Sequence, residues 1–447
     1  MKHKVLITID HKWRDLPSYV YLGVLLKSRG YKVEYFRNGI ERFAISGFQP
    51  NTIILNHAYS KERQKYLKYL DSSGVNIILL PTEGIPIIKE NLPWYAGVGV
   101  DLSSVAVNFY WNKTMQSYVN NHPNLRKKST KVVGVPRFDF YKEELNSLLM
   151  DKKTFCKKYN FPIYEKNIVF ATNYTSASFY EKNFAFLKKD IDVLNPPFAS
   201  EDEEELKKFP KTDFESRSIA LDFFLELVKS YPDVGFIIKT HPSEDQTFYH
   251  KYFAKKIESY KNRVLIISNE YIWNVLGIAD IEISRSCTTA IEAWILEKPT
   301  IEIQLHPKEL YTSKEHASGS VLVRNFSELH QAIESYLKDP FLEKEIILKR
   351  KNFIKKWCFK VDGKSSHRVI DEIVKLPQRP NSLRVNQFHR FVYLTIKLTD
   401  FFIHDLKIFK WKIFLKDRQD SLGRKDKFFH YKDIRNWEKR IIQTIQK

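Results

Sequence analysis

Long apolar runs and a cysteine framework are both missing from this chain of 447 residues. No uncharged apolar stretch approaches the ~20 residues that a membrane-spanning helix needs, and the N-terminal stretch MKHKVLITIDHKW has too few apolar residues for the core of a signal peptide. The cysteines Cys156, Cys287 and Cys358 lie far apart and lack the spacing of a disulfide framework or a zinc site. These absences predict a cytoplasmic protein.

The sequence also has neither a GxGxxG fingerprint nor a Walker loop, which disfavours the dehydrogenase and P-loop kinase classes. Its histidines are scattered and no DxD-like pair follows a strand-like run, so we expect neither a metal nor a cofactor. Positive charge, in contrast, is abundant: 73 Lys and Arg stand against 53 Asp and Glu, a net charge of +20. Such an excess favours anionic partners, which include nucleotides, nucleic acid and anionic membranes.

Short β-branched runs alternate with helix-like stretches, and this alternation is typical of doubly wound parallel sheets. The runs form two series: 5–10, 33–36, 52–56, 75–80, 105–109 and 131–135, then 167–172, 234–240, 263–268, 280–284, 299–305 and 320–323. The long interval at 173–232 is interpreted as a loop insertion followed by a helix at 214–230. We therefore predict an α/β, GT-B-like protein with two Rossmann-like domains facing a cleft, an acceptor domain at 1–145 and a nucleotide-sugar domain at 146–377.

The remaining segment, 378–447, is predicted to be a basic, aromatic, helical extension. From Leu383 onward it has sixteen Lys and Arg against seven Asp and Glu, with aromatic residues between them at roughly helical spacing. Such helices can lie in an anionic membrane interface, where each basic residue contributes roughly 1 kcal/mol. The alternative is an appendage that packs on the two domains and leaves its basic face solvated. The first interpretation would add a peripheral position at the inner membrane to the cytoplasmic location.

Polar residues follow two strand-like runs of the second series, at the edge where ligands of parallel sheets bind. His241 and Pro242 come directly after one run, although a lone His-Pro also occurs in ordinary turns. The segment SRSCTTAIEA has four hydroxyls near a helix start, whereas capping needs only one; the surplus favours a phosphate at the helix N-terminus. Glu292 could bind a ribose or be a solvated helix carboxylate. The candidate nucleotide-binding residues are Lys239, His241, Pro242, Ser284, Arg285, Ser286, Thr288, Thr289 and Glu292.

In the first half, Glu83 follows the run at 75–80, where a carboxylate could act as a general base or belong to an ordinary turn. Asp10, His11 and Arg14 follow the first run. They could bind an acceptor or cap a helix starting near Leu16.

Two further segments have open roles. Arg137 and Asp139 could form a domain-joining ion pair or contact a substrate. The helix that carries His367 and Arg368 is predicted to be a structural crossing helix.

Two Rossmann-like domains with a His-Pro and a later Ser/Thr cluster resemble the GT-B glycosyltransferases, especially bacterial CMP-sugar enzymes such as sialyl and Kdo transferases. The sialyltransferases share an acidic-acidic-Gly motif, a His-Pro motif and a Ser-Ser/Thr motif. In this sequence the last two would fall on His241 with Pro242 and on Thr288 with Thr289. The acidic-acidic-Gly motif would fall on 82–84, where Thr82 departs from the pattern. The general base is therefore Glu83 or lies elsewhere.

Over residues 1–375 the segments PTEGI, GVPRFD, KTHPSE and DGKSSHR are also similar to surface carbohydrate biosynthesis proteins. The resemblance implies a GT-B fold and a role in capsule or lipopolysaccharide assembly. Since the sequence offers no metal site, we expect a metal-independent glycosyltransferase with Glu83 and His241 as catalytic residues. It would move a sugar from a nucleotide-sugar, with a CMP-sugar as one option, to a surface polysaccharide or lipid-linked acceptor.

Alternatives are a CDP-polyol phosphotransferase of the teichoic-acid type and a nonhydrolysing nucleotide-sugar epimerase. A noncatalytic scaffold that binds RNA or lipid is a further alternative. RNA-binding signatures are not evident in the sequence, so no nucleic-acid partner is expected.

Overall fold

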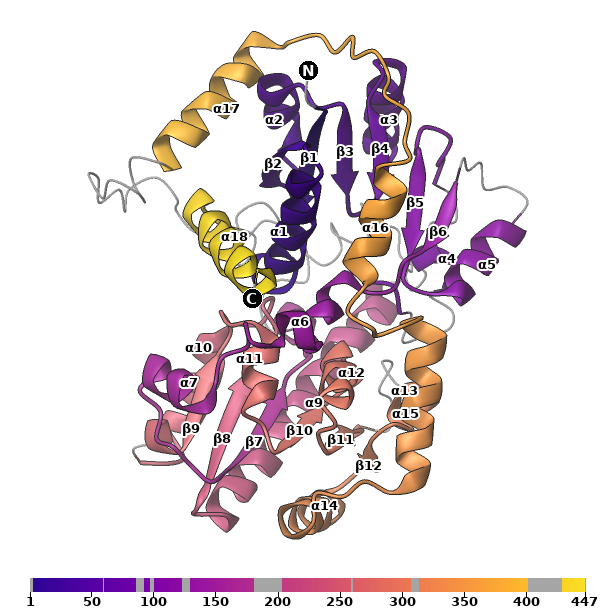
Figure 1. Cartoon of the computed structure of the whole chain (residues 1–447). Helices are drawn as coiled ribbons and strands as arrows, with labels where there is room; N and C mark the ends of the chain where they lie inside the picture. Colours follow the sequence, from indigo (N-terminus) through magenta and orange to yellow (C-terminus); the bar gives the residue numbers. More distant parts are fainter. Residues whose placement is uncertain are drawn as a thin grey trace. The chain divides into compact units, whose positions relative to one another are not determined.

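The computed structural model describes residues 3–58, 60–85, 92–96, 100–122, 129–180, 203–258, 260–306, 313–400 and 428–446. The chain forms two compact units (Figure 1). Unit 1 comprises Met1–Ile85, Tyr95–Leu148 and Lys356–Lys447, and unit 2 comprises Pro86–Trp94 and Leu149–Lys355. The sequence analysis assigned 356–377 to the second domain and 378–447 to a separate extension, whereas the structure places both in unit 1.

Unit 1 is built on a six-stranded parallel sheet of order β2-β1-β3-β4-β5-β6. Its strands are β1 Lys4–Ile9, β2 Lys32–Arg37, β3 Thr52–Leu55, β4 Asn76–Leu79, β5 Val107–Tyr110 and β6 Thr130–Val132. Because β2 and β3 pair with opposite edges of β1, the strand order reverses there, and ligands of such sheets bind at the carboxyl ends beside this reversal.

Helices in unit 1 follow most strands. They are α1 Lys12–Ser28, α2 Glu41–Phe48, α3 Lys61–Ser72, α5 Lys113–Asn121, α6 Glu143–Asn146, α16 Ser365–Ile373, α17 Gln387–Asp400 and α18 Tyr431–Ile445, with the 3-10 helix η2 Pro136–Tyr141. The short helix α4 Leu92–Ala96 spans the boundary between the units. Helix α1 begins at Lys12 rather than near Leu16, because the backbone N–H of His11 bonds to the carboxylate of Asp15, at 3.1 Å, and fixes the first turn there.

Unit 2 contains a second six-stranded parallel sheet, of order β12-β11-β10-β7-β8-β9. Its strands are β7 Lys166–Ala171, β8 Val234–Lys239, β9 Val264–Ile267, β10 Ile281–Ser284, β11 Thr300–Ile303 and β12 Val321–Val323. Since β8 and β10 flank β7 on opposite sides, the reversal of this sheet lies between β7 and β10.

The helices of unit 2 are α7 Lys152–Tyr159, α9 Glu203–Ser230, α10 Gln246–Ala254, α11 Ile272–Gly277, α12 Thr288–Ile295, α13 Lys314–Ala317, α14 Phe326–Lys338 and α15 Lys344–Trp357, with the 3-10 helix η4 Tyr260–Asn262. Helix α9 begins well before the predicted 214. Residues 181–202 of the predicted loop insertion lie outside the described residues.

Both faces of the unit 2 sheet are buried, which explains its nearly continuous apolar strands. Along β7, Ile168 and Phe170 pack with Phe224 of α9, whereas Val169 between them packs with Phe155 on the opposite face. Alternate side chains of one strand therefore enter two different cores.

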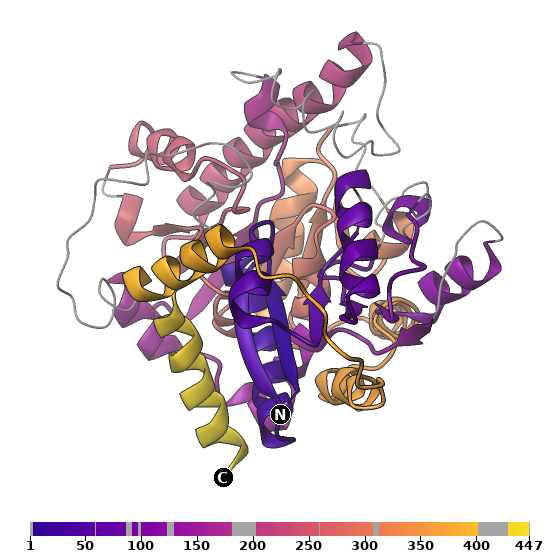
Figure 2. The same cartoon turned by 90° about the horizontal axis from the view of Figure 1, so that it is seen from above.

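The two described helices of the C-terminal segment, α17 and α18, belong to unit 1 (orange and yellow in Figures 1 and 2). Helix α18 buries Ile434, Trp437 and Ile441, and Trp437 makes an edge contact with Phe140 at 6.1 Å between ring centroids. Helix α18 is therefore packed, as in the predicted appendage, but within unit 1 rather than on two domains. None of the described helices combines the length and apolarity required to span a bilayer.

Candidate active site

Turns after β8, β7 and β10 are neighbours at the carboxyl edge of the unit 2 sheet. The backbone N–H of His241, after β8, donates to Thr172 Oγ1 at 3.2 Å, after β7. On its other side the β7 turn meets the β10 turn, because Asn173 Nδ2 donates to the carbonyl of Arg285 at 3.3 Å. The structure thus brings the predicted His-Pro turn and the predicted hydroxyl-rich turn to one edge, joined by a β7 turn that the sequence analysis missed.

The His241 ring is oriented by its own turn. The backbone N–H of Ser243 donates to His241 Nδ1 at 3.1 Å. Because Nδ1 accepts, the hydrogen of the neutral imidazole is on Nε2, which makes Nε2 a donor. His241 and Pro242 are both half-buried at this edge.

Glu244, the last residue of KTHPSE, organises the β7 turn. Its Oε1 accepts from Thr172 Oγ1 at 2.9 Å and from the backbone N–H of Tyr174 at 3.1 Å, and its other oxygen accepts from Tyr249. Burial raises the pKa of this carboxyl, while the hydrogen bonds act in the opposite direction. Glu244 therefore positions the β7 turn, in which Thr172 accepts the hydrogen bond from the backbone of His241.

Lys239, at the end of β8, is buried beneath this edge, with 8% of its surface exposed. Its Nζ donates to the carbonyl of Ser268 at 2.8 Å and to that of Thr240 at 3.3 Å. Burial lowers the pKa of Lys239 to about 8, with Glu270 acting in the opposite direction. The ammonium is mainly charged at neutral pH and adds positive potential to the edge.

Arg285, predicted to bind nucleotide, is buried, and its guanidinium makes hydrogen bonds within the unit. Its Nη2 donates to Asp213 Oδ1 at 2.5 Å and to the carbonyl of Asn173 at 2.9 Å. The guanidinium also lies over the ring of Tyr174, 4.4 Å from the centroid. The structure therefore assigns Arg285 to holding the β7 and β10 turns together.

Ser286 has a similar internal role. Its backbone is left-handed, with φ of 43°, and both its N–H and its hydroxyl donate to Glu302 Oε1, at 2.6 and 2.9 Å. Ser284, at the end of β10, is also completely buried. The hydroxyl of Ser286 thus shapes the turn from within the unit.

Helix α12 begins at Thr288, with Cys287 as N-cap and no side-chain capping bond. None of the four hydroxyls of this segment therefore caps the helix. Thr289 Oγ1 donates to Glu282 Oε1 at 3.1 Å, whereas Thr288 is half-buried at the helix start. First-turn N–H groups without a side-chain cap, together with the positive end of the helix dipole, suit an anion. Glu292 is 3% exposed, so it is not the solvated carboxylate that one interpretation expected.

In unit 1, the predicted acceptor-side residues meet around Arg14. The guanidinium donates to Glu83 Oε1 at 2.6 Å, to Asp15 Oδ1 at 2.8 Å and to Asp10 Oδ2 at 3.4 Å. Burial opposes the charge of Arg14, but the nearby carboxylates outweigh it and raise its pKa. His11 is buried at the N-cap of α1, while 55% of the Glu83 side chain is exposed.

Arg137 and Asp139 connect three of the segments that carried the family resemblance. Arg137 donates to the carbonyl of Thr82 at 2.9 Å, in PTEGI. Asp139 accepts the backbone N–H groups of Ser365 and Ser366 at 3.0 and 2.7 Å, at the start of α16. The Asp139 bonds lie within unit 1, so they are not the expected domain-joining pair. They agree with the predicted structural role of α16.

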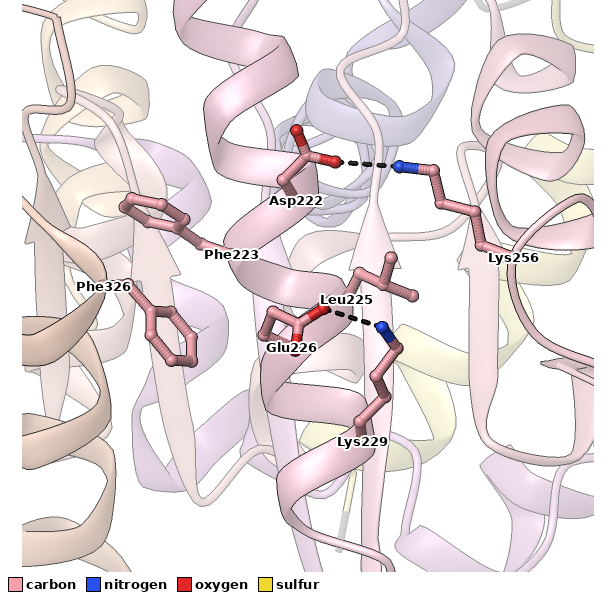
Figure 3. A pocket seen from close by; sticks show the side chains of 7 residues that line it. All are labelled: Asp222, Phe223, Leu225, Glu226, Lys229, Lys256 and Phe326. Atoms are coloured by element: carbon pink, nitrogen blue, oxygen red, sulfur yellow. Dashed lines mark hydrogen bonds and ion pairs between the residues drawn. The ribbon is translucent and has the colours of Figure 1, made fainter.

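A surface hollow in unit 2 lies apart from these turns (Figure 3). It is lined by Asp222, Phe223, Leu225, Glu226, Lys229, Lys256 and Phe326. Asp222 pairs with Lys256 at 2.9 Å and Glu226 with Lys229 at 2.7 Å, so its charges are compensated. None of the predicted site residues lines this hollow.

Within the described part of the chain, no three His, Cys, Asp or Glu side chains gather as a metal site. Metal independence stays a prediction.

Solved structures of similar architecture come from two enzyme types. The wall teichoic acid polymerase TagF, soaked with CDPG, has a TM-score of 0.52 at 14% identity, over 84% of this chain and 88% of that one. The UDP-GlcNAc 2-epimerase of Methanocaldococcus jannaschii, in complex with UDP-GlcNAc and UDP, has a TM-score of 0.50 at 12% identity, over 84% and 99%. At such identities the similarity shows the fold alone, and it confirms the GT-B class with two Rossmann-like domains.

Among curated proteins, none matches the sequence significantly. The family model of CDP-Glycerol:Poly(glycerophosphate) glycerophosphotransferase matches residues 103–375. This match confirms that the chain is a transferase and supports the teichoic-acid alternative. It does not support the narrower resemblance to CMP-sugar sialyl and Kdo transferases. Because the match spans more than half of the chain, the protein belongs to the CDP-glycerol:poly(glycerophosphate) glycerophosphotransferase family.

Proposed function

We propose that this enzyme transfers a polyol phosphate from a CDP-activated donor to a hydroxyl of a surface polymer or its lipid-linked precursor, and releases CMP. The observation that carries the proposal is the meeting of the β7, β8 and β10 turns at one sheet edge. There His241 Nε2 and the start of α12 are two donors suited to a phosphate. The family match favours a cytidine nucleotide as the carrier, and TagF, of similar fold, was soaked with CDPG.

The proposed reaction is a substitution at the β-phosphorus of the donor. The acceptor hydroxyl oxygen forms a bond to this phosphorus, and the bond from phosphorus to the bridging oxygen breaks. CMP leaves with the electron pair, and the carboxylate of Glu83 takes the hydroxyl proton. His241 and the N–H groups at Thr288 stabilise the negative charge that develops on the departing phosphate, without a metal or cofactor.

A CMP-sugar donor is the second candidate, because the His-Pro turn and the pair Thr288–Thr289 stand at the same sheet edge. In that reaction the acceptor oxygen would attack the anomeric carbon, and CMP would again be the leaving group. Capsule or lipopolysaccharide assembly would then be the context. The two reactions share the donor-phosphate site and differ in the atom that is attacked.

The product mass separates the candidates. The purified enzyme is incubated with CDP-glycerol, CDP-ribitol, CMP-sugars and UDP-N-acetylglucosamine, each with a polyol-phosphate or glycan-primed lipid acceptor. We expect release of CMP and an acceptor heavier by one polyol phosphate. An acceptor heavier by a sugar would favour the second candidate, and epimerised UDP-sugar without acceptor would contradict both.

The binding of CMP is expected to weaken as the pH rises from about 7 to about 9, because the pKa of Lys239 lies near 8. The nucleotide phosphate is already doubly charged above its second pKa of about 6, so the loss of the ammonium charge reduces the attraction. Calorimetric titration with CMP at several pH values measures this effect.

The matched variants are Lys239→Met and Lys229→Met. Lys239→Met should bind CMP several-fold more weakly at neutral pH, with a flat dependence on pH across this range. Lys229→Met, in the hollow of Figure 3, should behave as wild type. A flat profile for the wild type would contradict the electrostatic role of Lys239.

A further inference from the structure

Helix α17 is fixed to unit 1 by one of its faces. The hydroxyl of Tyr393 donates to Glu34 Oε2 at 2.7 Å, and Lys397 Nζ donates to the same oxygen at 2.6 Å. The Tyr393 ring also fills the space beside Gly47 of α2, where an added Cβ would lie 2.0 Å from Tyr393 Cδ1. Figure 1 shows α17 beside α2. The orientation of α17 is therefore set by specific contacts.

The opposite face of α17 carries large apolar side chains that are exposed. Phe388 and Phe391 are 66% and 67% exposed, and Leu394 and Leu398 are 47% and 56% exposed. Their spacing of three to four residues places them along one side of the helix. Tyr393, which is buried, lies on the other side.

This stripe is unusual for the described part of the molecule. Of the thirteen exposed large hydrophobic residues, five lie within 385–398, including Val385 just before the helix. Scattered exposed apolar residues are ordinary, whereas a continuous apolar stripe on one element indicates a surface that binds a protein, a ligand or a membrane.

The charges beside the stripe are basic. Arg384 and Arg390 are exposed, and the chain from residue 383 onward has sixteen Lys and Arg against seven Asp and Glu. A helix with aromatic and leucine side chains on one face and basic side chains beside them has the pattern of an interfacial membrane helix. A second copy of the chain is a poorer occupant, since a two-fold contact pairs this face with itself and offers Arg384 and Arg390 no opposite charge.

We infer that the exposed face of α17 docks on an anionic lipid surface. Phe388, Phe391, Leu394 and Leu398 would enter the acyl boundary, while Arg384 and Arg390 would meet the headgroups. This inference goes beyond the predicted basic extension because it names the face, and it is independent of the proposed reaction.

Sedimentation with vesicles tests the docking face. The full chain is mixed with vesicles of equal parts phosphatidylcholine and phosphatidylglycerol, or of phosphatidylcholine alone. We expect the wild type to pellet with the anionic vesicles, more weakly at high salt, and far less with the neutral ones. The double variant Phe388→Ser with Phe391→Ser should lose at least about a hundredfold in partitioning, since burial of each phenylalanine is worth roughly tenfold or more.

The matched control is Phe341→Ser, which removes a phenylalanine that is 85% exposed in unit 2 and should leave pelleting unchanged. Binding of CMP by the double variant should equal that of the wild type, which separates this inference from the proposed function. Unchanged pelleting of the double variant, or an equal loss in Phe341→Ser, would overturn it. The inference would also be overturned if the wild type pelleted with neither kind of vesicle and dimerised through α17.

Discussion

The variant His241→Ala should lose roughly 10²–10³-fold in kcat, because one preorganised donor to a developing anionic charge is worth about this much. Its imidazole is held by the backbone N–H of Ser243 at Nδ1, so Nε2 is a donor before any ligand arrives. Alanine removes this donor and leaves the backbone bond from His241 to Thr172 in place. We therefore expect a folded protein with an unchanged unfolding midpoint.

His250→Ala is the matched control for this experiment. His250 is also half-buried in unit 2, on α10, and its Nδ1 lies 2.8 Å from the hydroxyl of Tyr260. Its loss should leave kcat close to that of the wild type. Steady-state release of CMP measures both variants. A His241→Ala enzyme with wild-type turnover would exclude the imidazole from the reaction.

The variant Glu83→Gln should lower kcat by roughly 10²–10⁴-fold, the usual contribution of a positioned general base, with little change in the affinity for CMP. Glutamine keeps the size of the side chain and can still accept from Arg14, which donates to Glu83 Oε1 at 2.6 Å. The substitution thus removes the proton acceptor while it preserves the local contacts.

Two further variants make the Glu83 result specific. Glu62→Gln, at an exposed position in the first turn of α3, should have no effect. Asp10→Asn tests the neighbouring carboxylate, which also bonds to Arg14. If Glu83→Gln turns over normally and Asp10→Asn does not, the base is Asp10, and the assignment made from PTEGI is wrong.

The fold was predictable because its strands are buried on both faces. Val169 and Phe170 of β7 enter different cores, so the strand is apolar over 168–171 and stands out from the helices around it. The first residue of a helix was harder to predict. Helix α1 begins at Lys12 rather than near Leu16, because the side chain of Asp15 bonds to the backbone of His11.

The candidate site was predictable only in part. The position of His241 follows from its place after a strand, but the roles in the hydroxyl-rich turn depend on partners far away in sequence. Ser286 bonds to Glu302, and Arg285 bonds to Asp213, which lies 72 residues away. Thr172 was missed because a lone threonine after a strand has no distinctive local pattern. Its importance comes from Glu244, which reaches it from the β8 turn.

A crystal structure with CMP bound is the most direct test of the donor-phosphate site. We predict that phosphate oxygens lie within hydrogen-bonding distance of His241 Nε2 and of the backbone N–H groups that begin α12 at Thr288. A phosphate held elsewhere, whether in the hollow lined by Asp222 and Lys256 or beside Arg14 in unit 1, would contradict the account.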